Sequence, residues 1–306
     1  MWTRSEVAKA SPHFRANPVV LVTGTTSGIG FEIVRKLWKS DYRVVATARK
    51  ESLSKFNNVE FKETDRFWIR RLDVTSAEER AELVAEISKA WGGVDILINN
   101  AGISYRAVVE HMTDEEEIHQ LQTNYLGAVG LIRLVLPWMR SQHNGQIINI
   151  SSVSGMMAMP TMSSYSASKF ALEGASESLW YEVRPWNIRV CLVQPGFIHS
   201  ESFRNVYFSK RSAVCDINPD AYCQYYADMA PFIERLMKLS PTSAEDIARR
   251  VMKIMHAKNP PLRVPATWDA SVFYWVRRLL PRWFYHRFLY WGLPGVKNWT
   301  KLAKRN

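Results

Sequence analysis

The chain alternates short apolar runs with longer stretches of helical periodicity, and this pattern predicts an α/β fold. The first run, residues 19–22, is continuously apolar, which is typical of a strand buried on both faces of a sheet. Five further runs predict strands: residues 43–47, 68–72, 94–98, 146–150 and 188–193. Because helical patterns separate these runs, we expect βαβ units and one parallel sheet.

Signals for helix starts and breaks refine this pattern. Ser76 and Glu79 form a capping-box sequence that opens the helix after the third strand. A longer helical region covers residues 113–139 and contains Gly127 and Pro137, near which we expect a break.

A glycine-rich turn connects the first strand to the first helix. It runs from Thr23 to Gly30, and its glycines allow a tight turn and a close approach of the backbone to a ligand. Strand, turn and helix in this order direct backbone N–H groups toward a pyrophosphate. The spacing G-x-x-x-G-x-G differs from the usual G-x-G-x-x-G, and such turns also occur without a ligand. The position directly after the first strand favours a dinucleotide site.

The end of the second predicted strand bears on the choice of dinucleotide. NAD-binding folds usually place an acidic residue about twenty positions beyond the glycines, where it accepts a hydrogen bond from the ribose 2′-hydroxyl. This chain has Ala48 and Arg49 there. A guanidinium in place of a carboxylate favours a 2′-phosphate, so we expect NADP, with NAD as the alternative. The competing interpretation is that Arg49 is a solvated surface residue.

Tyr165 and Lys169 lie four residues apart in a helical pattern and therefore share one helix face. An ordinary phenol has a pKa of about 10 and is a poor acid at neutral pH, whereas a nearby cation lowers that pKa. Such a tyrosine can protonate a carbonyl oxygen or accept a proton from an alcohol. Taken alone, the pair is better explained as two surface residues. A catalytic interpretation of the pair requires a cofactor site and a polar partner for the tyrosine, such as Ser152 at the carboxyl end of the fifth strand.

Four motifs occur together in one order. They are Thr23-Gly24-x-x-x-Gly28-x-Gly30, Asn99-Asn100-Ala101-Gly102, Ser152 thirteen residues before Tyr165-x-x-x-Lys169, and Pro195-Gly196. With their spacing and their strand–helix context, they resemble the short-chain dehydrogenases/reductases over about residues 18–265. The resemblance implies a single α/β domain, doubly wound and of Rossmann type, in which helices flank seven parallel strands. The seventh strand is expected near residues 262–264.

The resemblance also implies catalytic roles for four residues. Tyr165 corresponds to the acid/base, and Ser152 to the residue that hydrogen-bonds the reacting oxygen. Lys169 corresponds to the residue that lowers the pKa of the tyrosine and binds the nicotinamide ribose. Asn124 corresponds to the residue that holds a proton-relay water, although an isolated amide of this kind is more often structural.

Cofactor-binding residues are implied in the same way. Asp73 and Val74 match an adenine-binding pair, and Ser200 keeps a hydroxyl where the family usually has threonine. The glycine turn lacks the Lys or Arg that some NADP users carry there. The full set is Gly24, Thr26, Ser27, Gly28, Ile29, Gly30, Arg49, Asp73, Val74, Asn100, Ala101, Gly102, Tyr165, Lys169, Pro195, Gly196, Ile198 and Ser200.

Residues 197–241 correspond to the substrate lid of the family and are rich in aromatic side chains. These are Phe197, Phe203, Tyr207, Phe208, Tyr222, Tyr225, Tyr226 and Phe232. Apolar walls suit a large hydrophobic substrate such as a sterol, a retinoid or a long-chain lipid. The other interpretation is that these rings only pack the lid on the core.

Residues 268–306 extend beyond the expected end of the domain at residue 267 and mix aromatic with basic side chains. They hold eight Lys or Arg residues and one acidic residue. Such a segment cannot span a bilayer, but it can lie in its interface. The competing interpretation is packing over the substrate pocket or in a subunit interface.

The remaining bulk properties exclude other classes of protein. Of the net charge of +11, most lies in this extension, and the near-neutral body is unlike a nucleic-acid-binding domain. Cys191, Cys215 and Cys223 have no C-x-x-C spacing, so we expect a reducing compartment, no disulfide and no metal site. Residues 1–17, expected to be a flexible tail, are too polar for a signal peptide. We therefore expect a cytoplasmic protein, with peripheral membrane contact left open.

These features together predict an NADP(H)-dependent oxidoreductase that interconverts a carbonyl and an alcohol on a hydrophobic small molecule. We expect a homo-oligomer, either a dimer or a tetramer. The alternative is a non-catalytic NADP-binding protein of the same fold with a regulatory or scaffold role. The complete set of Asn124, Ser152, Tyr165 and Lys169 favours the enzyme, because a non-catalytic relative would be free to lose any of them.

Overall fold

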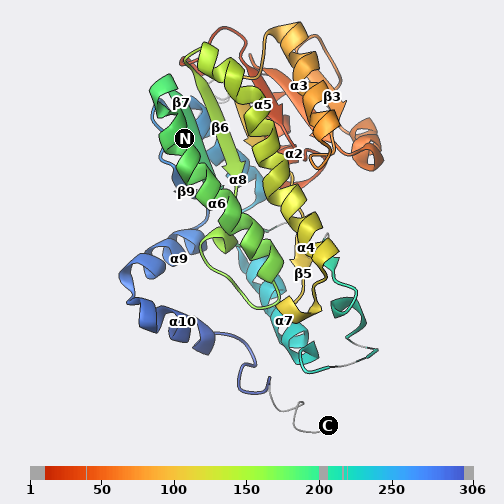
Figure 1. Cartoon of the computed structure of the whole chain (residues 1–306), viewed down its shortest axis with the longest axis vertical. Helices are drawn as coiled ribbons and strands as arrows, with labels where there is room; N and C mark the ends of the chain where they lie inside the picture. Colours follow the sequence, from red (N-terminus) through yellow and green to blue (C-terminus); the bar gives the residue numbers. More distant parts are fainter. Residues whose placement is uncertain (1–10, 39, 200–205, 216, 219, 300–306) are drawn as a thin grey trace.

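The computed structural model describes residues 11–38, 40–199, 206–215, 217–218 and 220–299. Within this part of the chain, seven parallel strands form one sheet in the order β3-β2-β1-β4-β6-β7-β9 (Figure 1). They are β1 (Val19–Val22), β2 (Arg43–Ala48), β3 (Phe67–Arg71), β4 (Ile96–Asn99), β6 (Gly145–Ile150), β7 (Ile188–Gln194) and β9 (Arg263–Pro265). The predicted fold is confirmed.

Helices bury both faces of this sheet. The α-helices of the described residues are α2 (Gly28–Leu37), α3 (Ala77–Trp91), α4 (Asp114–Leu121), α5 (Gly127–Ser141), α6 (Ser163–Val183), α7 (Cys223–Leu239), α8 (Ala244–His256), α9 (Trp268–Leu279) and α10 (Arg282–Trp291). α2 and α8 pack on one face, and α3, α5 and α6 on the other. Along β1, Val20 and Val22 belong to the first layer and Val19 and Leu21 to the second, so the continuously apolar run serves both.

The strand order reverses beside β1, which lies between β2 and β4. From β1 the chain first builds the sheet outward through β2 and β3, and then in the opposite direction from β4 onward. In doubly wound sheets the crevice at this reversal, outside the carboxyl ends of the strands, is where dinucleotides bind.

The long helical region predicted for residues 113–139 is interrupted directly before Gly127, near one of the two predicted positions, and continues through Pro137. One turn of π-helix, Gln122–Leu126, separates α4 from α5, and Pro137 lies inside α5 without ending it. Single π-helical turns occur frequently at functional sites. This one carries Asn124.

Residues 11–17 are held on the domain, in contrast to the flexible tail that the sequence predicts. The Arg15 side chain forms an ion pair with Asp95 at 2.9 Å and donates a hydrogen bond to the Trp91 carbonyl. The backbone N–H of Ser11 donates to the Tyr42 hydroxyl at 2.8 Å. Residues 1–10 lie outside the described residues.

The lid is joined to the core by a second sheet, in which β5 (Tyr105–Arg106) pairs in parallel with β8 (Tyr207–Phe208). A disulfide joins Cys215 to Cys223, at the start of α7. The prediction of no disulfide is therefore wrong. The disulfide can form because the fold of the lid places the two Cα atoms 5.3 Å apart, although the two cysteines are eight residues apart in sequence and form no C-x-x-C motif.

Parts of the C-terminal extension pack on the domain, as one of the two interpretations predicts. At the start of α9, the Asp269 carboxylate accepts a hydrogen bond from the Phe197 N–H at 2.9 Å. Beyond α10, the buried Trp299 stacks on Tyr225 of α7 with ring centroids 4.1 Å apart, and its N–H donates to Asp228. In the described part of the chain, no helix is both long and apolar enough to cross a bilayer.

Candidate active site

The glycine turn after β1 requires glycine for steric reasons. Gly24 has a φ of +68°, and a Cβ atom there would lie 2.8 Å from the backbone of Ala101. A Cβ atom on Gly30 would lie 2.3 Å from the Gly24 carbonyl oxygen and 2.4 Å from the Asn100 side chain. At Gly28, where φ is +58°, no atom lies within 4 Å of the Cβ position. The turn therefore packs tightly against Asn100 and Ala101, whereas the space beside Gly28 is open.

Asn100 and Thr23 hold this turn against the end of β4. The Asn100 side chain donates hydrogen bonds to the carbonyls of Thr23 and Gly24 at 3.0 and 2.8 Å. The Thr23 hydroxyl accepts hydrogen bonds from the backbone N–H groups of Asn100 and Ala101, both at 2.9 Å. These contacts explain why the Asn-Asn-Ala-Gly segment and the glycine turn occur together.

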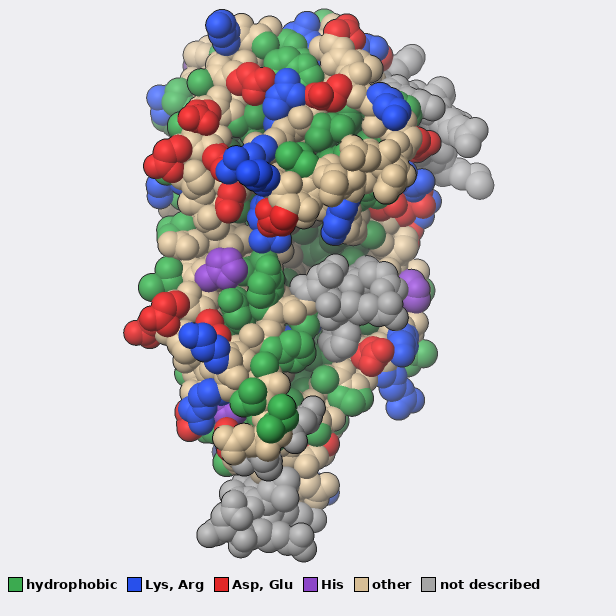
Figure 2. Space-filling model, turned by 90° about the vertical axis from the view of Figure 1, so that its right-hand side faces the viewer, with side chains coloured by type: hydrophobic (Ala, Val, Ile, Leu, Met, Phe, Trp, Pro, Cys, Tyr) green, Lys and Arg blue, Asp and Glu red, His purple; other side chains and the backbone are tan. Residues whose placement is uncertain are grey.

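A cavity of about 690 Å³ extends from this turn to α6 and the lid. Figure 2 shows a face of the molecule that is hollowed between a charge-rich upper half and a lower half where hydrophobic side chains gather. Nearly all the predicted site residues line the cavity. Gly30 and Asn124 do not line it, and Ser200 lies outside the described residues.

The cavity suits a dinucleotide. Ser27, Gly28 and Ile29 line it at the start of α2, and the Ser27 side chain does not cap the helix, so the first N–H groups of α2 remain available to a phosphate. The open space in front of Gly28 leaves room for the backbone approach that a pyrophosphate needs. These residues are those that would hold the pyrophosphate.

Two cations line the end of the cavity beside β2. Arg49 forms an ion pair with Glu51 at 3.0 Å and lies close to Tyr207 of the lid. Ser52 and Lys55 line the same region, on a 3₁₀-helix (Lys50–Asn58). Ser52 and Lys55 are not predicted from the sequence, because their spacing from the glycines follows no motif. The available signal was a lysine shortly after the second strand.

Asp73, on the other wall of this region, stays ionised. Burial raises the pKa of its carboxyl group, but hydrogen bonds from the N–H and hydroxyl of Thr75, at 2.9 and 2.7 Å, outweigh it and lower the pKa below its usual value. The Asp73 N–H donates to the Glu79 carboxylate. Ser76 caps α3 as predicted, but Glu79 is turned to Asp73 and does not complete the capping box.

Ser152 and Tyr165 lie together on the cavity wall. Burial raises the pKa of Tyr165, and the Ser152 hydroxyl and the charge of Arg106 oppose this rise. The expected lowering of this pKa by Lys169 is not found. Arg106 lies on β5 and also lines the cavity, a position that only the pairing of β5 with the lid strand establishes.

Lys169 is buried one turn along α6 from Tyr165. Its ammonium donates a hydrogen bond to the Ile150 carbonyl at 2.9 Å, at the end of β6. Burial lowers the pKa of Lys169 to about 8, against the opposing charge of Glu173. Glu173 is held in turn by Arg263 at 2.9 Å.

The Asn124 side chain is fully engaged with its own surroundings. Its oxygen accepts a hydrogen bond from the Ile103 N–H at 2.8 Å. Its amide nitrogen donates to the Ile103 carbonyl and to the Ser168 hydroxyl at 2.9 and 3.0 Å. Asn124 therefore joins the π-turn to α6 and to the segment after β4, and its predicted role toward a relay water stays a prediction.

The wall opposite the glycine turn is apolar. It is lined by Met159, Met162, Phe197, Val206, Ile233 and Met237. Of the predicted lid aromatics that the structure describes, only Phe197 and Tyr207 reach the cavity; Phe203 lies outside the described residues. Tyr222 and Tyr226 instead contact His111, and Tyr225 supports Trp299. Most of these aromatic side chains therefore pack the lid on the core, as the second interpretation predicts. Three of the six residues of the apolar wall are methionines.

Sequence comparison relates the chain to known oxidoreductases. A family model described as short chain dehydrogenase matches residues 18–210. The 3-ketodihydrosphingosine reductase of Bacteroides thetaiotaomicron is 36% identical over 245 residues, which cover 80% of this chain and 86% of that protein. Retinol dehydrogenase 8 of Homo sapiens is 32% identical over 252 residues, which cover 80% of this chain and 79% of that protein.

Solved structures share the fold. A short-chain dehydrogenase from Streptomyces avermitilis has a TM-score of 0.72 at 32% identity, over 84% of this chain and 91% of its own. ElxO with NADP bound has a TM-score of 0.66 at 25% identity, over 81% of this chain and 96% of its own. These neighbours support a nicotinamide dinucleotide as the cofactor class.

Proposed function

Because the chain belongs to the short-chain dehydrogenase/reductase family, and is therefore an oxidoreductase acting on CH–OH groups, we propose that it interconverts a ketone or aldehyde and its alcohol on a lipid-like substrate with NADP(H). The observation that carries this proposal is that Ser152 and Tyr165 line the same cavity as the glycine turn and Lys169, close enough for the Ser152 hydroxyl to lower the pKa of the phenol. The glycine turn lies on one side of this pair, and the apolar wall lies on the other.

The bound nicotinamide supplies or accepts a hydride at the substrate carbon. Tyr165 donates a proton to the substrate oxygen during reduction and accepts it during oxidation, since its hydroxyl is the acidic group of the pair. Ser152 donates a hydrogen bond to the same oxygen and stabilises the charge that develops on it. Positioning by these two hydroxyls also excludes unproductive orientations of the substrate.

Arg106 provides positive charge near this proton transfer. It lines the cavity, and its charge favours the ionised form of the phenol. Lys169 lines the same cavity. Lys169 is the residue we assign to the nicotinamide ribose, because it lies between the end of β6 and Tyr165. Its buried ammonium needs further polar partners, which ribose hydroxyls provide.

NADP is the proposed cofactor because β2 ends in Ala48 and two cations line the cavity beside it, one of which, Arg49, is paired with Glu51. Arg49 and Lys55 line the cavity there, next to the Ser52 hydroxyl. A 2′-phosphate would be favoured by such a set through charge-assisted hydrogen bonds. Asp73 lies further along the wall, beyond the end of β3.

The proposed substrate is a long-chain or isoprenoid lipid carrying one ketone, aldehyde or hydroxyl group. The methionine-rich wall supports this class, since unbranched thioethers adapt to irregular apolar surfaces. The names of the sphingolipid and retinol relatives point in the same direction.

Membrane contact is also proposed, through the exposed face of α9 and α10. Large apolar side chains are exposed there: Trp268, Val272, Trp275, Leu279, Trp283, Phe288, Tyr290 and Trp291. Arg277, Arg278, Arg287 and Lys297 are exposed among them. Basic and aromatic side chains on one surface suit the interface of an anionic bilayer.

Purified protein incubated with NADPH and a panel of lipid ketones and aldehydes tests the activity. We expect consumption of NADPH, followed by its absorbance, with at least one long-chain carbonyl compound. Tyr165→Phe should reduce turnover by about 100-fold or more while NADPH binding persists. Tyr181→Phe, an exposed ring on the same helix, is the matched control. Tight NADPH binding without turnover of any carbonyl or alcohol would instead support the non-catalytic alternative.

A further inference from the structure

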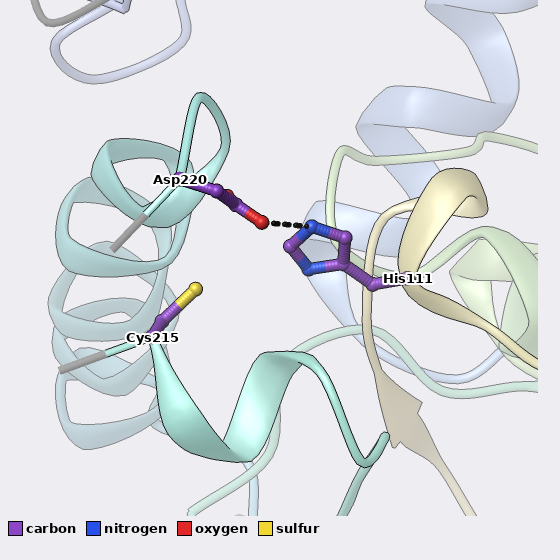
Figure 3. Close-up of side chains that lie close together, drawn as sticks. All are labelled: His111, Cys215 and Asp220. Atoms are coloured by element: carbon purple, nitrogen blue, oxygen red, sulfur yellow. Dashed lines mark ion pairs between the residues drawn. The ribbon is translucent and has the colours of Figure 1, made fainter. Parts of the chain in front are cut away.

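A second cluster of chemically active side chains lies where the lid meets the segment after β5, apart from the residues assigned to catalysis. His111, Cys215 and Asp220 come from three separate segments and point toward one another (Figure 3). One potential ligand atom from each lies within 4.8 Å of the other two. Cys223 belongs to the same cluster, because its sulfur is joined to Cys215 and accepts a hydrogen bond from the Asp220 N–H at 3.2 Å.

These four side chains are the types that zinc prefers. Zinc binds thiolate, imidazole and carboxylate ligands, usually four of them in a tetrahedron. His111 is fully buried and Cys215 is nearly so. Burial of these two ligands limits competition from water and favours a structural type of site, while Asp220 and Cys223 are half-buried.

His111 is also oriented as a metal ligand would be. Its Nε2 faces the Asp220 carboxylate at 2.7 Å, toward the centre of the cluster. Its Nδ1 lies 2.9 Å from the Tyr226 hydroxyl, which accepts a hydrogen bond from the Val108 N–H. A polar partner on the second imidazole nitrogen fixes the ring orientation and the tautomer in metal sites.

We propose that, when the Cys215–Cys223 disulfide is reduced, this cluster binds one zinc ion through His111, Cys215, Asp220 and Cys223. A thiol reductant breaks the S–S bond, gives the pair two electrons and two protons, and is itself oxidised to a disulfide. Zinc binding then releases both thiol protons. The ligands are two thiolates, one neutral imidazole and one carboxylate.

The geometry allows this exchange with local movement. Two sulfurs on one tetrahedral zinc lie about 3.8 Å apart for Zn–S bonds of about 2.3 Å. The Cα atoms of Cys215 and Cys223 are 5.3 Å apart, so side-chain rotation can separate the sulfurs by this amount.

The two states connect the lid to the rest of the protein differently. The disulfide links two lid residues to each other. Zinc would add His111, which lies on a short 3₁₀-helix (Val109–His111) shortly after β5. Since β5 carries Arg106 of the active-site cavity, the metal would fasten the lid directly beside the segment that borders the substrate.

Metal analysis of the untagged, full-length protein tests the proposal. One sample is reduced with a phosphine, another is left oxidised, and both receive zinc and are desalted. We expect about one zinc per chain in the reduced sample and none in the oxidised sample. Cobalt should give the absorption bands of a tetrahedral thiolate site only in the reduced sample. Zinc should also slow amide hydrogen exchange in α7.

Variants separate this site from adventitious binding. Cys215→Ser/Cys223→Ser should lose the zinc, whereas Cys191→Ser, which keeps both lid thiols, should retain it. Tyr226→Phe should weaken zinc binding about 10- to 100-fold by removing the hydroxyl beside His111. The proposal is overturned if reduced wild-type protein holds no zinc after desalting. It is equally overturned if the oxidised protein or the double serine variant holds as much.

Discussion

Lys169 lies one helical turn from Tyr165, with its ammonium 5.8 Å from the centre of the phenol ring, and donates a hydrogen bond to the Ile150 carbonyl. Both side chains are part of one cavity wall, and burial moves their pKa values in opposite directions. The phenol becomes harder to ionise and the ammonium easier to neutralise. The charge that opposes the rise at Tyr165 comes from Arg106, on a different element.

Arg106→Gln should shift the pH dependence of the oxidation reaction toward higher pH. Alcohol oxidation requires the ionised phenol, so its rate rises with pH up to the pKa of Tyr165. Removing the Arg106 charge raises that pKa, because the charge opposes the effect of burial. Kinetics with saturating NADP and alcohol between pH 6 and about 10 measure the shift. An unchanged profile would show that Arg106 does not act on the phenol.

Lys169→Met should change how the stability of the cofactor-free protein depends on pH. The folded pKa of about 8 lies below the ordinary value of 10.5, so the unfolded chain binds more protons between these two values. The free energy of unfolding of the parent should therefore rise from pH 8 to 10.5, by up to about 3 kcal/mol relative to the methionine variant. Below pH 8 the difference between the two proteins should be constant.

Denaturant titrations at closely spaced pH values measure this difference. Lys238→Met, which removes an exposed lysine, is the control and should titrate like the parent. Parallel curves for the parent and Lys169→Met between pH 8 and 10.5 would contradict the lowered pKa of Lys169.

Arg49→Ala/Lys55→Ala should weaken NADP binding by about 100-fold or more and leave NAD binding nearly unchanged. Hydrogen bonds to a charged phosphate contribute about 1.5–3 kcal/mol each, and NAD lacks that phosphate. Fluorescence titration with both cofactors measures the ratio. Lys50→Ala, an exposed neighbour on the same segment, is the control. Equal losses for both cofactors would place the phosphate elsewhere.

Trp275→Ser/Leu279→Ser should release the protein from anionic vesicles. Both side chains are exposed on α9, at 57% and 74%, and line an apolar groove with Phe288 of α10. Binding should require anionic lipid and weaken with salt, since the contribution of the arginines is screened. Vesicle flotation with and without anionic lipid measures both effects.

This pair of substitutions tests the surface without disturbing the cavity. Removing residues 268–306 would also remove Asp269 and Trp299, which support Phe197 and the lid. Tyr181→Ser, at another exposed aromatic position, should bind as the parent does. Full-length protein that stays free of every vesicle would leave packing as the whole role of the extension.

The sequence by itself determined the strands, the glycine turn and the candidate catalytic residues. Each depends on neighbouring residues: the apolar run of β1 fits burial on two faces, and Gly24 permits a φ of +68° that other residues rarely adopt. The spacing of Tyr165 and Lys169 places them on one face of any helix that forms there. Patterns of this local kind can be read without a tertiary structure.

Only the tertiary structure decided which distant side chains share a site. Arg106 and Lys55 reach the cavity through the pairing of β5 with β8 and through the 3₁₀-helix after β2. His111 meets Cys215 and Asp220 across about a hundred residues of chain, so no spacing rule relates them. Burial likewise decided the pKa values of Tyr165 and Lys169, because desolvation depends on everything packed around a group and not on its neighbours in sequence.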